Sequence, residues 1–184
     1  MASEKRSKIS RTLIGAPRGF TVGELLIVIG IVGLVLGILI PTVMAVRKSA
    51  RSTECLVNLR QISAAMRQYA MDSQGLLPDP FVNQKSWEAS LDGYLLAKGI
   101  FLCPDDREVA PATGSSYDWR DTGDAKTTVA GQNLWSITRG NAVFIFDALP
   151  GWHAPHHINA VDIDGTARDW GEVECFNDLG KPVR

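Results

Sequence analysis

The chain has 184 residues, a formal net charge of −1 at pH 7 and three cysteines. This length allows one ordinary domain and a membrane segment, and the nearly neutral charge gives no basis for capture of nucleic acid. Cys55, Cys103 and Cys175 are too few and too scattered for a zinc cluster, because neither a C-x-x-C pair nor a paired Cys/His spacing occurs.

The chain begins with a polar and basic stretch, residues 1–19, in which we find no helical period. Its basic residues are Lys5, Arg6, Lys8, Arg11 and Arg18, and its one acidic residue is Glu4. We interpret this stretch as a basic leader without regular structure.

A long apolar segment follows the leader. Leu25 to Val46 are 22 residues without a charge, and a helix of that length spans about 33 Å, enough for a bilayer core. Glu24 is the charge at its start, where a carboxylate within hydrocarbon is costly. Residues 20–46 are therefore predicted to form a transmembrane and assembly helix. Glycines at spacings of three and four either let another helix pack closely or are simply common in membrane helices: Gly30, Gly33 and Gly37.

The helical pattern continues beyond Pro41, where we expect a kink because proline lacks a backbone donor. Residues 47–75 have apolar residues on one side only and read as an amphipathic continuation that ends near Asp72. The apolar stripe that we expect to pack on a soluble domain contains Leu56, Leu59, Ile62, Met66 and Tyr69. Together the two halves predict one helix of about fifty residues, about 75 Å long.

Residues 76–184 are rich in turn-forming residues and contain short apolar runs. We predict a short helix within 86–98, an extended run at 100–104, and strands near 127–129, 141–148, 157–165 and 166–176. The pair 157–165 and 166–176 is joined by Asp-Gly, a strong hairpin signal. The prediction is an α+β fold in which a small antiparallel sheet packs on the second half of the long helix.

The sequence GFTVGELL, followed by its apolar run, resembles the class III signal of type IV pilins and of type II secretion pseudopilins. In that family a basic leader ends in Gly, Phe usually follows, and Glu lies four residues further on; here these are Gly19, Phe20 and Glu24. Pro41 also lies where such proteins often carry proline. One departure is Gly23, where the family usually has a larger apolar residue.

The resemblance continues in residues 54–78 and in FLCPDD, residues 101–106, which are similar to the pseudopilin-like proteins of planctomycete-type bacteria. Members of that group often end in His, about nine residues, then Asp-Gly. Here the spacing differs, because His153 lies one residue too far from Asp164, while His156 and His157 lie too close.

The resemblance implies a non-enzymatic, pilin-like subunit. It implies that a prepilin peptidase cuts between Gly19 and Phe20 and methylates the new amino terminus of Phe20. It also implies that Glu24 pairs with an amino terminus and sets the register between subunits. The chain would lie once across the lipid bilayer of the inner (cytoplasmic) membrane, with the leader cytoplasmic and residues 76–184 extracytoplasmic. Its partners would be an assembly platform and other pilin or pseudopilin subunits, identical or different. Pilus and secretion pseudopilus both stay open.

Two other classes of protein were weighed. An ordinary secretory signal peptide has an apolar region of about 7–15 residues, which is shorter than this one, although VMA at 43–45 loosely fits a cleavage site.

A membrane-anchored metal-binding or enzymatic domain would use the histidines at 153, 156 and 157 with Asp162 and Asp164. Against it, aspartates at a hairpin are favoured by turn geometry alone, and H-E-x-x-H, G-x-S-x-G and phosphate-loop motifs do not occur. Calcium held by Asp162 and Asp164 is the weaker metal prediction.

The cysteines allow one disulfide prediction. Cys55 lies on the predicted helix, and Cys103 precedes a proline turn in the domain that should cover this helix. We expect a Cys55–Cys103 disulfide that leaves Cys175 free, and the alternative is three unpaired buried thiols.

Overall fold

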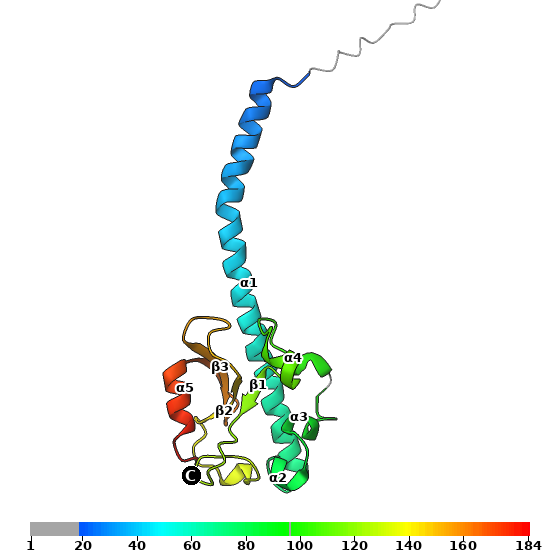
Figure 1. The fold of residues 1–184 in the computed structure, drawn as a ribbon, viewed down its shortest axis with the longest axis vertical. Coiled ribbons are helices and arrows are strands. Elements are labelled where there is room, and N and C mark those ends of the chain that lie inside the picture. The colour runs from blue at the N-terminus through cyan, green and yellow to red at the C-terminus, as the bar shows by residue number, and fades with distance from the viewer. Residues whose placement is uncertain (1–18, 96) are drawn as a thin grey trace, which may run out of the picture. The chain divides into compact units, whose positions relative to one another are not determined.

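The computed structural model describes residues 19–95 and 97–184 (Figure 1). Of the predicted leader, residues 1–18 lie outside the described residues. The chain divides into two compact units, and the boundary falls between Val43 and Met44. This boundary lies three residues before the end predicted for the transmembrane segment, and the two units are described separately below.

The helix α1, Val22–Asp72, is continuous over 51 residues and passes through Pro41, so the length predicted from sequence is confirmed. The kink at Pro41 stays a prediction. The turn after the helix contains Gly75, whose φ of +91° favours glycine and whose N–H donates to the carbonyl of Ala70 at 2.7 Å. A Cβ atom at Gly75 would lie 2.5 Å from Nδ2 of Asn133, so this side chain would have to move to accept a larger residue.

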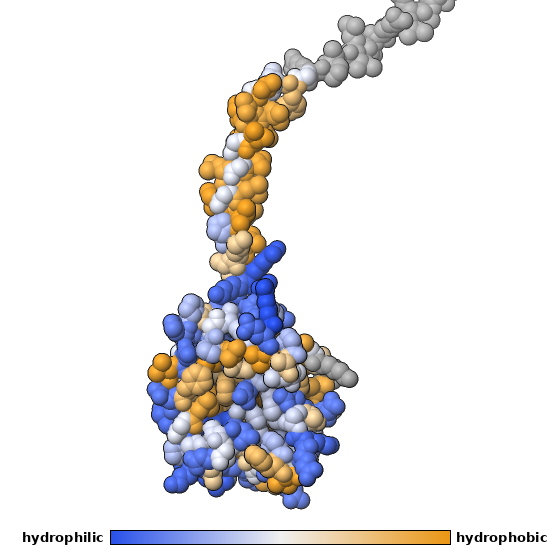
Figure 2. Space-filling model, in the orientation of Figure 1, coloured by the Kyte–Doolittle hydropathy of each residue, from blue (hydrophilic) through white to orange (hydrophobic). Residues whose placement is uncertain are grey.

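In the first unit the large apolar side chains of α1 are exposed on all sides of the helix. Figure 2 shows them as a nearly continuous apolar surface on the face in view. Within the described residues this is the one helix that is long and apolar enough to cross a membrane, judged by length and composition. Such a helix fits the predicted single-pass anchor.

The second unit contains a four-stranded antiparallel sheet in the order β1-β2-β3-β4, so each strand pairs with its neighbour in sequence. The strands are β1, Tyr117–Trp119; β2, Val143–Asp147; β3, His157–Asp162; and β4, Ala167–Gly171. The predicted α+β class, a long helix packed on a small antiparallel sheet in a pilin-like arrangement, is confirmed.

Both faces of this sheet are covered. One face packs against α1, where Leu59, Ile62 and Met66 are fully buried with Ile145 and Val161 of the sheet. Burial of each such side chain contributes about 1.5–3 kcal/mol. The other face packs against α5, Glu172–Leu179. Its apolar cluster contains Val143, Phe146, Ile158, Ala160, Trp170 and Cys175. Coverage on both sides explains why β2 is buried at all five positions.

Several short elements differ from the prediction. Residues 127–129 form no strand, because the N–H groups of Thr127 and Thr128 both donate to the carbonyl of Asp124 in a turn. The first strand is β1 instead. The stretch 166–176 is divided between β4 and α5, because Gly171 caps a helix that has Glu172 and Glu174 in its first turn. The remaining elements are α2, Pro80–Asn83; α3, Trp87–Ser90; η1, Lys98–Phe101; α4, Val109–Thr113; and η2, Leu134–Ser136.

A fully buried arginine, Arg120, fastens α5 to the sheet. Its Nη1 donates to Oδ2 of Asp178 at 3.0 Å, and its Nη2 donates to the carbonyl of Asp178 at 2.8 Å, at the end of α5. Asp178 also accepts the N–H of Val143 at 2.9 Å and pairs with Arg139. Burial raises the pKa of Asp178, but these hydrogen bonds outweigh it and hold the pKa below its ordinary value.

We predict that Asp178→Asn destabilises the domain. Breaking a buried ion pair typically costs about 3–5 kcal/mol, because the partner charge stays buried. The folded pKa of Asp178 is lowered, so its stabilising contribution is present above the ordinary value of 3.8 and is lost as the pH falls through the folded pKa. In denaturant unfolding followed by tryptophan fluorescence, the difference from the wild type should be large at pH 7 and should shrink below pH 3.8. The surface variant Asp92→Asn is the control, and an equal effect of both variants would contradict the prediction.

We also predict that a fragment of residues 47–184 is soluble and folded by itself. Its part of α1 has one apolar face, and the sheet of the same unit covers that face. Circular dichroism and gel filtration test this directly. An unfolded or aggregated fragment would show that the domain requires the preceding apolar helix.

Candidate functional site

A disulfide joins Cys55 of α1 to Cys103, which follows η1, with 5.5 Å between the two Cα atoms. This is the pairing favoured from the sequence. Cys175 is buried on the opposite face of the sheet and has a free thiol. The disulfide therefore ties the helix to a segment 48 residues away in the chain.

The segment that carries Cys103 is held by a serine and an aspartate. The N–H of Cys103 donates to Oγ of Ser116 at 2.9 Å, and this hydroxyl donates to Oδ2 of Asp106 at 2.7 Å. Asp106 also accepts the N–H groups of Glu108, Val109 and Ala110 at the start of α4. Burial raises the pKa of Asp106, but these hydrogen bonds prevail and lower it below the usual value. The position of Cys103 is thus fixed by its own loop.

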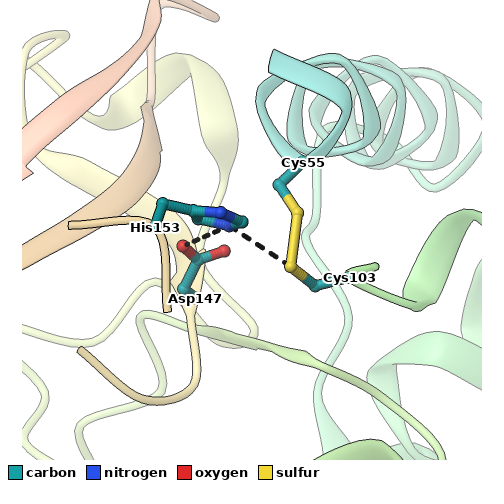
Figure 3. A group of neighbouring side chains, drawn as sticks. All are labelled: Cys55, Cys103, Asp147 and His153. Atoms are coloured by element: carbon teal, nitrogen blue, oxygen red, sulfur yellow. Dashed lines mark hydrogen bonds and ion pairs between the residues drawn. A yellow bond between two sulfur atoms is a disulfide. The ribbon is translucent and has the colours of Figure 1, made fainter. Parts of the chain in front are cut away.

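A histidine and an aspartate face the disulfide from the side of the sheet (Figure 3). The Nε2 atom of His153 lies 3.2 Å from Sγ of Cys103 and 3.7 Å from Oδ2 of Asp147. Asp147 is the last residue of β2, and His153 lies in the loop between β2 and β3. Within the described residues, Cys55, Cys103, Asp147 and His153 form a group whose potential ligand atoms all lie within 4.8 Å of one another.

Burial dominates the electrostatics of this group. It raises the pKa of Asp147 to about 8, against an opposing hydrogen bond from the N–H of Asn159. It lowers the pKa of His153, against the opposing charge of Asp105. Both shifts disfavour the charged form of the side chain, so the surroundings resist an unpaired charge at either residue.

An aspartate outside the group orients the histidine. Oδ2 of Asp105 lies 3.0 Å from Nδ1 of His153, and Oδ1 of Asp105 accepts a hydrogen bond from Nη1 of Arg51 at 2.8 Å. The line from Arg51 through Asp105 to His153 directs Nε2 toward Cys103 and Asp147. With both cysteines reduced, this arrangement supplies the donor types of a zinc site.

The three histidines predicted as one group are separated by the structure. His153 faces the disulfide, whereas His156 pairs with Glu172 at 3.1 Å and His157 pairs with Asp169 at 3.0 Å on the surface. The structure also brings Cys55 and Cys103 close to Asp147 and His153, although these residues lie far apart in sequence. Neither Asp147 nor Asp105 was expected at a site. Two signals in the sequence could have indicated them. Asp105 belongs to the acidic pair that follows Cys103, and Asp147 lies near the end of the strand predicted at 141–148.

The two weak metal candidates, Asp162 and Asp164, belong to the β3–β4 hairpin. Asp162 pairs with Nη2 of Arg168 at 3.1 Å, and Oδ1 of Asp164 accepts the N–H of Thr166 at 2.8 Å within the turn. These contacts place both residues in the hairpin, and Oδ1 of Asp162 is buried without a hydrogen-bond partner among the described residues. Calcium at this place stays a prediction.

At the start of α1, Gly19 and Phe20 are exposed, and Glu24 has a local partner. The carboxylate of Glu24 accepts the N–H and the hydroxyl of Thr21, both at 2.8 Å, and Oγ1 of Thr21 accepts the N–H of Glu24 at 3.2 Å. This reciprocal pair is a capping box. Its sequence signal, Thr-x-x-Glu before an apolar run, was not used in the sequence prediction.

Comparison with protein-family models, with curated proteins and with solved structures finds no match to this chain.

We predict that peptide mapping without reduction finds Cys55 linked to Cys103 and finds Cys175 alkylated only after unfolding. By chain entropy, a bridge that closes a loop of 48 residues stabilises the fold by about 4 kcal/mol. Reduction should therefore lower the denaturation midpoint clearly, and Cys175→Ser should leave the effect of reduction unchanged. A Cys103–Cys175 link would contradict this assignment.

Proposed function

We propose that this chain is a prepilin-like subunit, anchored in the inner membrane and polymerised through α1 into a pilus or a secretion pseudopilus. A prepilin peptidase cuts it after Gly19 and methylates Phe20. In this proposal the chain is a substrate of that enzyme and contributes no catalytic residue itself. Its partners are the assembly platform and further pilin-like subunits.

One observation carries this proposal: α1 changes character along its length. Its first part exposes apolar side chains on all sides, and its second part buries one face in an α+β domain. A helix of the first kind needs lipid or other helices around it, and the second kind supplies a soluble head. The pattern of Gly19, Phe20 and Glu24 at its start adds the signal by which such a subunit would be cut.

Glu24 has two roles to distinguish. The capping box with Thr21 satisfies the carboxylate within one chain. After cleavage, the new amino terminus of Phe20 on an incoming subunit provides a positive partner for Glu24 of an assembled one. Two charges that are costly in lipid would then neutralise each other and fix the offset between apolar helices.

We predict that Glu24→Gln and Glu24→Ala are both inserted and cut but assemble poorly. Glutamine retains the capping box and removes the charge, so it isolates the pairing role. Leaving the amino terminus buried and unpaired costs about 3–5 kcal/mol, which is about two to four orders of magnitude in the assembly equilibrium. N-terminal sequencing measures the cut, and recovery of sheared or cross-linked polymers measures assembly.

Two further variants serve as controls for this experiment. Thr21→Ala weakens the cap and retains the charge, and it should assemble nearly normally. Gly19→Val should stay uncut, because the residue before the cut is changed. Normal polymer yield from Glu24→Gln would remove the charge-pairing role and leave Glu24 as a helix cap.

A further inference from the structure

We propose that Cys55, Cys103, His153 and Asp147 bind one zinc ion when the disulfide between the two cysteines is reduced. The four residues come from α1, from the loop after η1, from β2 and from the loop that follows β2. The proposal does not depend on cleavage or polymerisation of the chain.

The distances within the group suit a tetrahedral zinc ion. Zinc bonds of about 2.0–2.3 Å to nitrogen, oxygen and sulfur place neighbouring ligand atoms about 3.3–3.8 Å apart. Nε2 of His153 lies 3.2 Å from Sγ of Cys103 and 3.7 Å from Oδ2 of Asp147. The two sulfur atoms separate when their bond is broken, and a Cα separation of 5.5 Å lets both face one ion.

The histidine is already oriented as a ligand. A proton on Nδ1, which lies 3.0 Å from a carboxylate oxygen of Asp105, leaves Nε2 without a proton in the neutral ring, and Nε2 is the atom that faces Cys103 and Asp147 (Figure 3). Metal-binding histidines commonly donate their second N–H to a carboxylate in this way. Arg51 in turn holds Asp105, so two residues outside the site support one ligand.

The aspartate brings an independent observation. The side chain of Asp147 is only 2% exposed, and its Oδ1 atom has no hydrogen-bond partner among the described residues. Buried polar atoms without a partner are rare in folded proteins and call for an explanation such as an ion. A zinc ion bound to this carboxylate, whose Oδ2 faces His153 and whose Oδ1 lacks a partner in the protein, would stabilise its ionised form in these buried surroundings.

The ion can reach the group from solvent. His153 also lines an open surface hollow together with Ser49, Ser52 and Asp169. The other three residues of the group are almost completely buried: Cys55, Cys103 and Asp147. The site is therefore closed on the side of the core, and the hollow approaches it at His153, whose side chain is 6% exposed.

The chemistry balances with an external dithiol as the reductant. The dithiol gives two electrons and two protons to the Cys55–Cys103 bond and becomes a disulfide itself. The two thiols, and the Asp147 carboxyl where it is protonated, then lose their protons to solvent as the thiolates and the carboxylate bind zinc. A sulfur atom in the disulfide is not a thiolate, so the disulfide and the zinc site exclude each other.

The test uses the full-length protein in detergent, reduced without oxygen by a phosphine and compared with the oxidised protein. We expect one zinc ion per chain after desalting of the reduced protein and none in the oxidised protein. Co²⁺ should give the absorption of a tetrahedral site with thiolate ligands, a readout that needs no substitution. Absence of zinc and of this Co²⁺ spectrum in the reduced wild type would overturn the proposal.

Matched variants identify the ligands. His153→Gln and Asp147→Asn should each weaken zinc binding at least tenfold, and Asp105→Asn should weaken it about 10- to 100-fold through the histidine. His157→Gln and Cys175→Ser replace the same residue types outside the group and should bind as the wild type does. The disulfide holds each variant in its oxidised state, where circular dichroism confirms the fold. Unchanged affinity in His153→Gln or Asp147→Asn would overturn the four-ligand site.

Discussion

The sheet of the domain has one face that packs against α1, and the contact between them organises the second unit. Leu59, Ile62 and Met66 lose all contact with water there, while the same helix exposes its apolar residues in the first unit. A single helix therefore meets two different requirements. Where a sheet lies beside it, an apolar stripe is sufficient, and polar residues fill the other side. The part of α1 that ends at Val43 has apolar residues on all sides. Such a composition calls for a nonpolar environment supplied from outside the chain.

A disulfide stabilises the packing on one face of the sheet, and a buried ion pair stabilises the packing on the other. On the face toward α1, the Cys55–Cys103 bond links the helix to the loop between η1 and α4. On the opposite face, Arg120 donates hydrogen bonds to the carboxylate of Asp178 and to carbonyl groups at the end of α5. The two interactions differ in what removes them. Reduction breaks the first one, whereas protonation of Asp178 at low pH weakens the second. The faces of the sheet thus respond to different conditions, although one sheet connects them.

The parts of this structure that follow from local pattern could be predicted. The length of α1, its buried stripe, β2 and β3 all leave a mark within a short stretch of sequence, and the disulfide was predicted from the expected packing of the domain on the helix. β1 and α5 do not, because YDW is too short for a pattern and because α5 depends on capping by Gly171. Arg120 and the group around His153 were also missed. The residues of both sites are brought together from segments 40 or more residues apart, so no local pattern predicts their contacts. Asp105 and His153, for example, are 48 residues apart.

The group of Cys55, Cys103, Asp147 and His153 lies where α1 meets the sheet. Its disulfide form and its proposed zinc-bound form would therefore both hold the helix against the sheet. Cys55 lies on the buried face of α1, and the other three residues belong to the domain that covers this face. A disulfide joins the helix to one loop by one covalent bond. A zinc ion would join it to that loop, to the end of β2 and to the following loop at once, through four coordinate bonds. Either state holds α1 against the sheet. The contact on which the domain depends is therefore cross-linked by the disulfide under oxidising conditions, and under reducing conditions it would be cross-linked by the proposed ion.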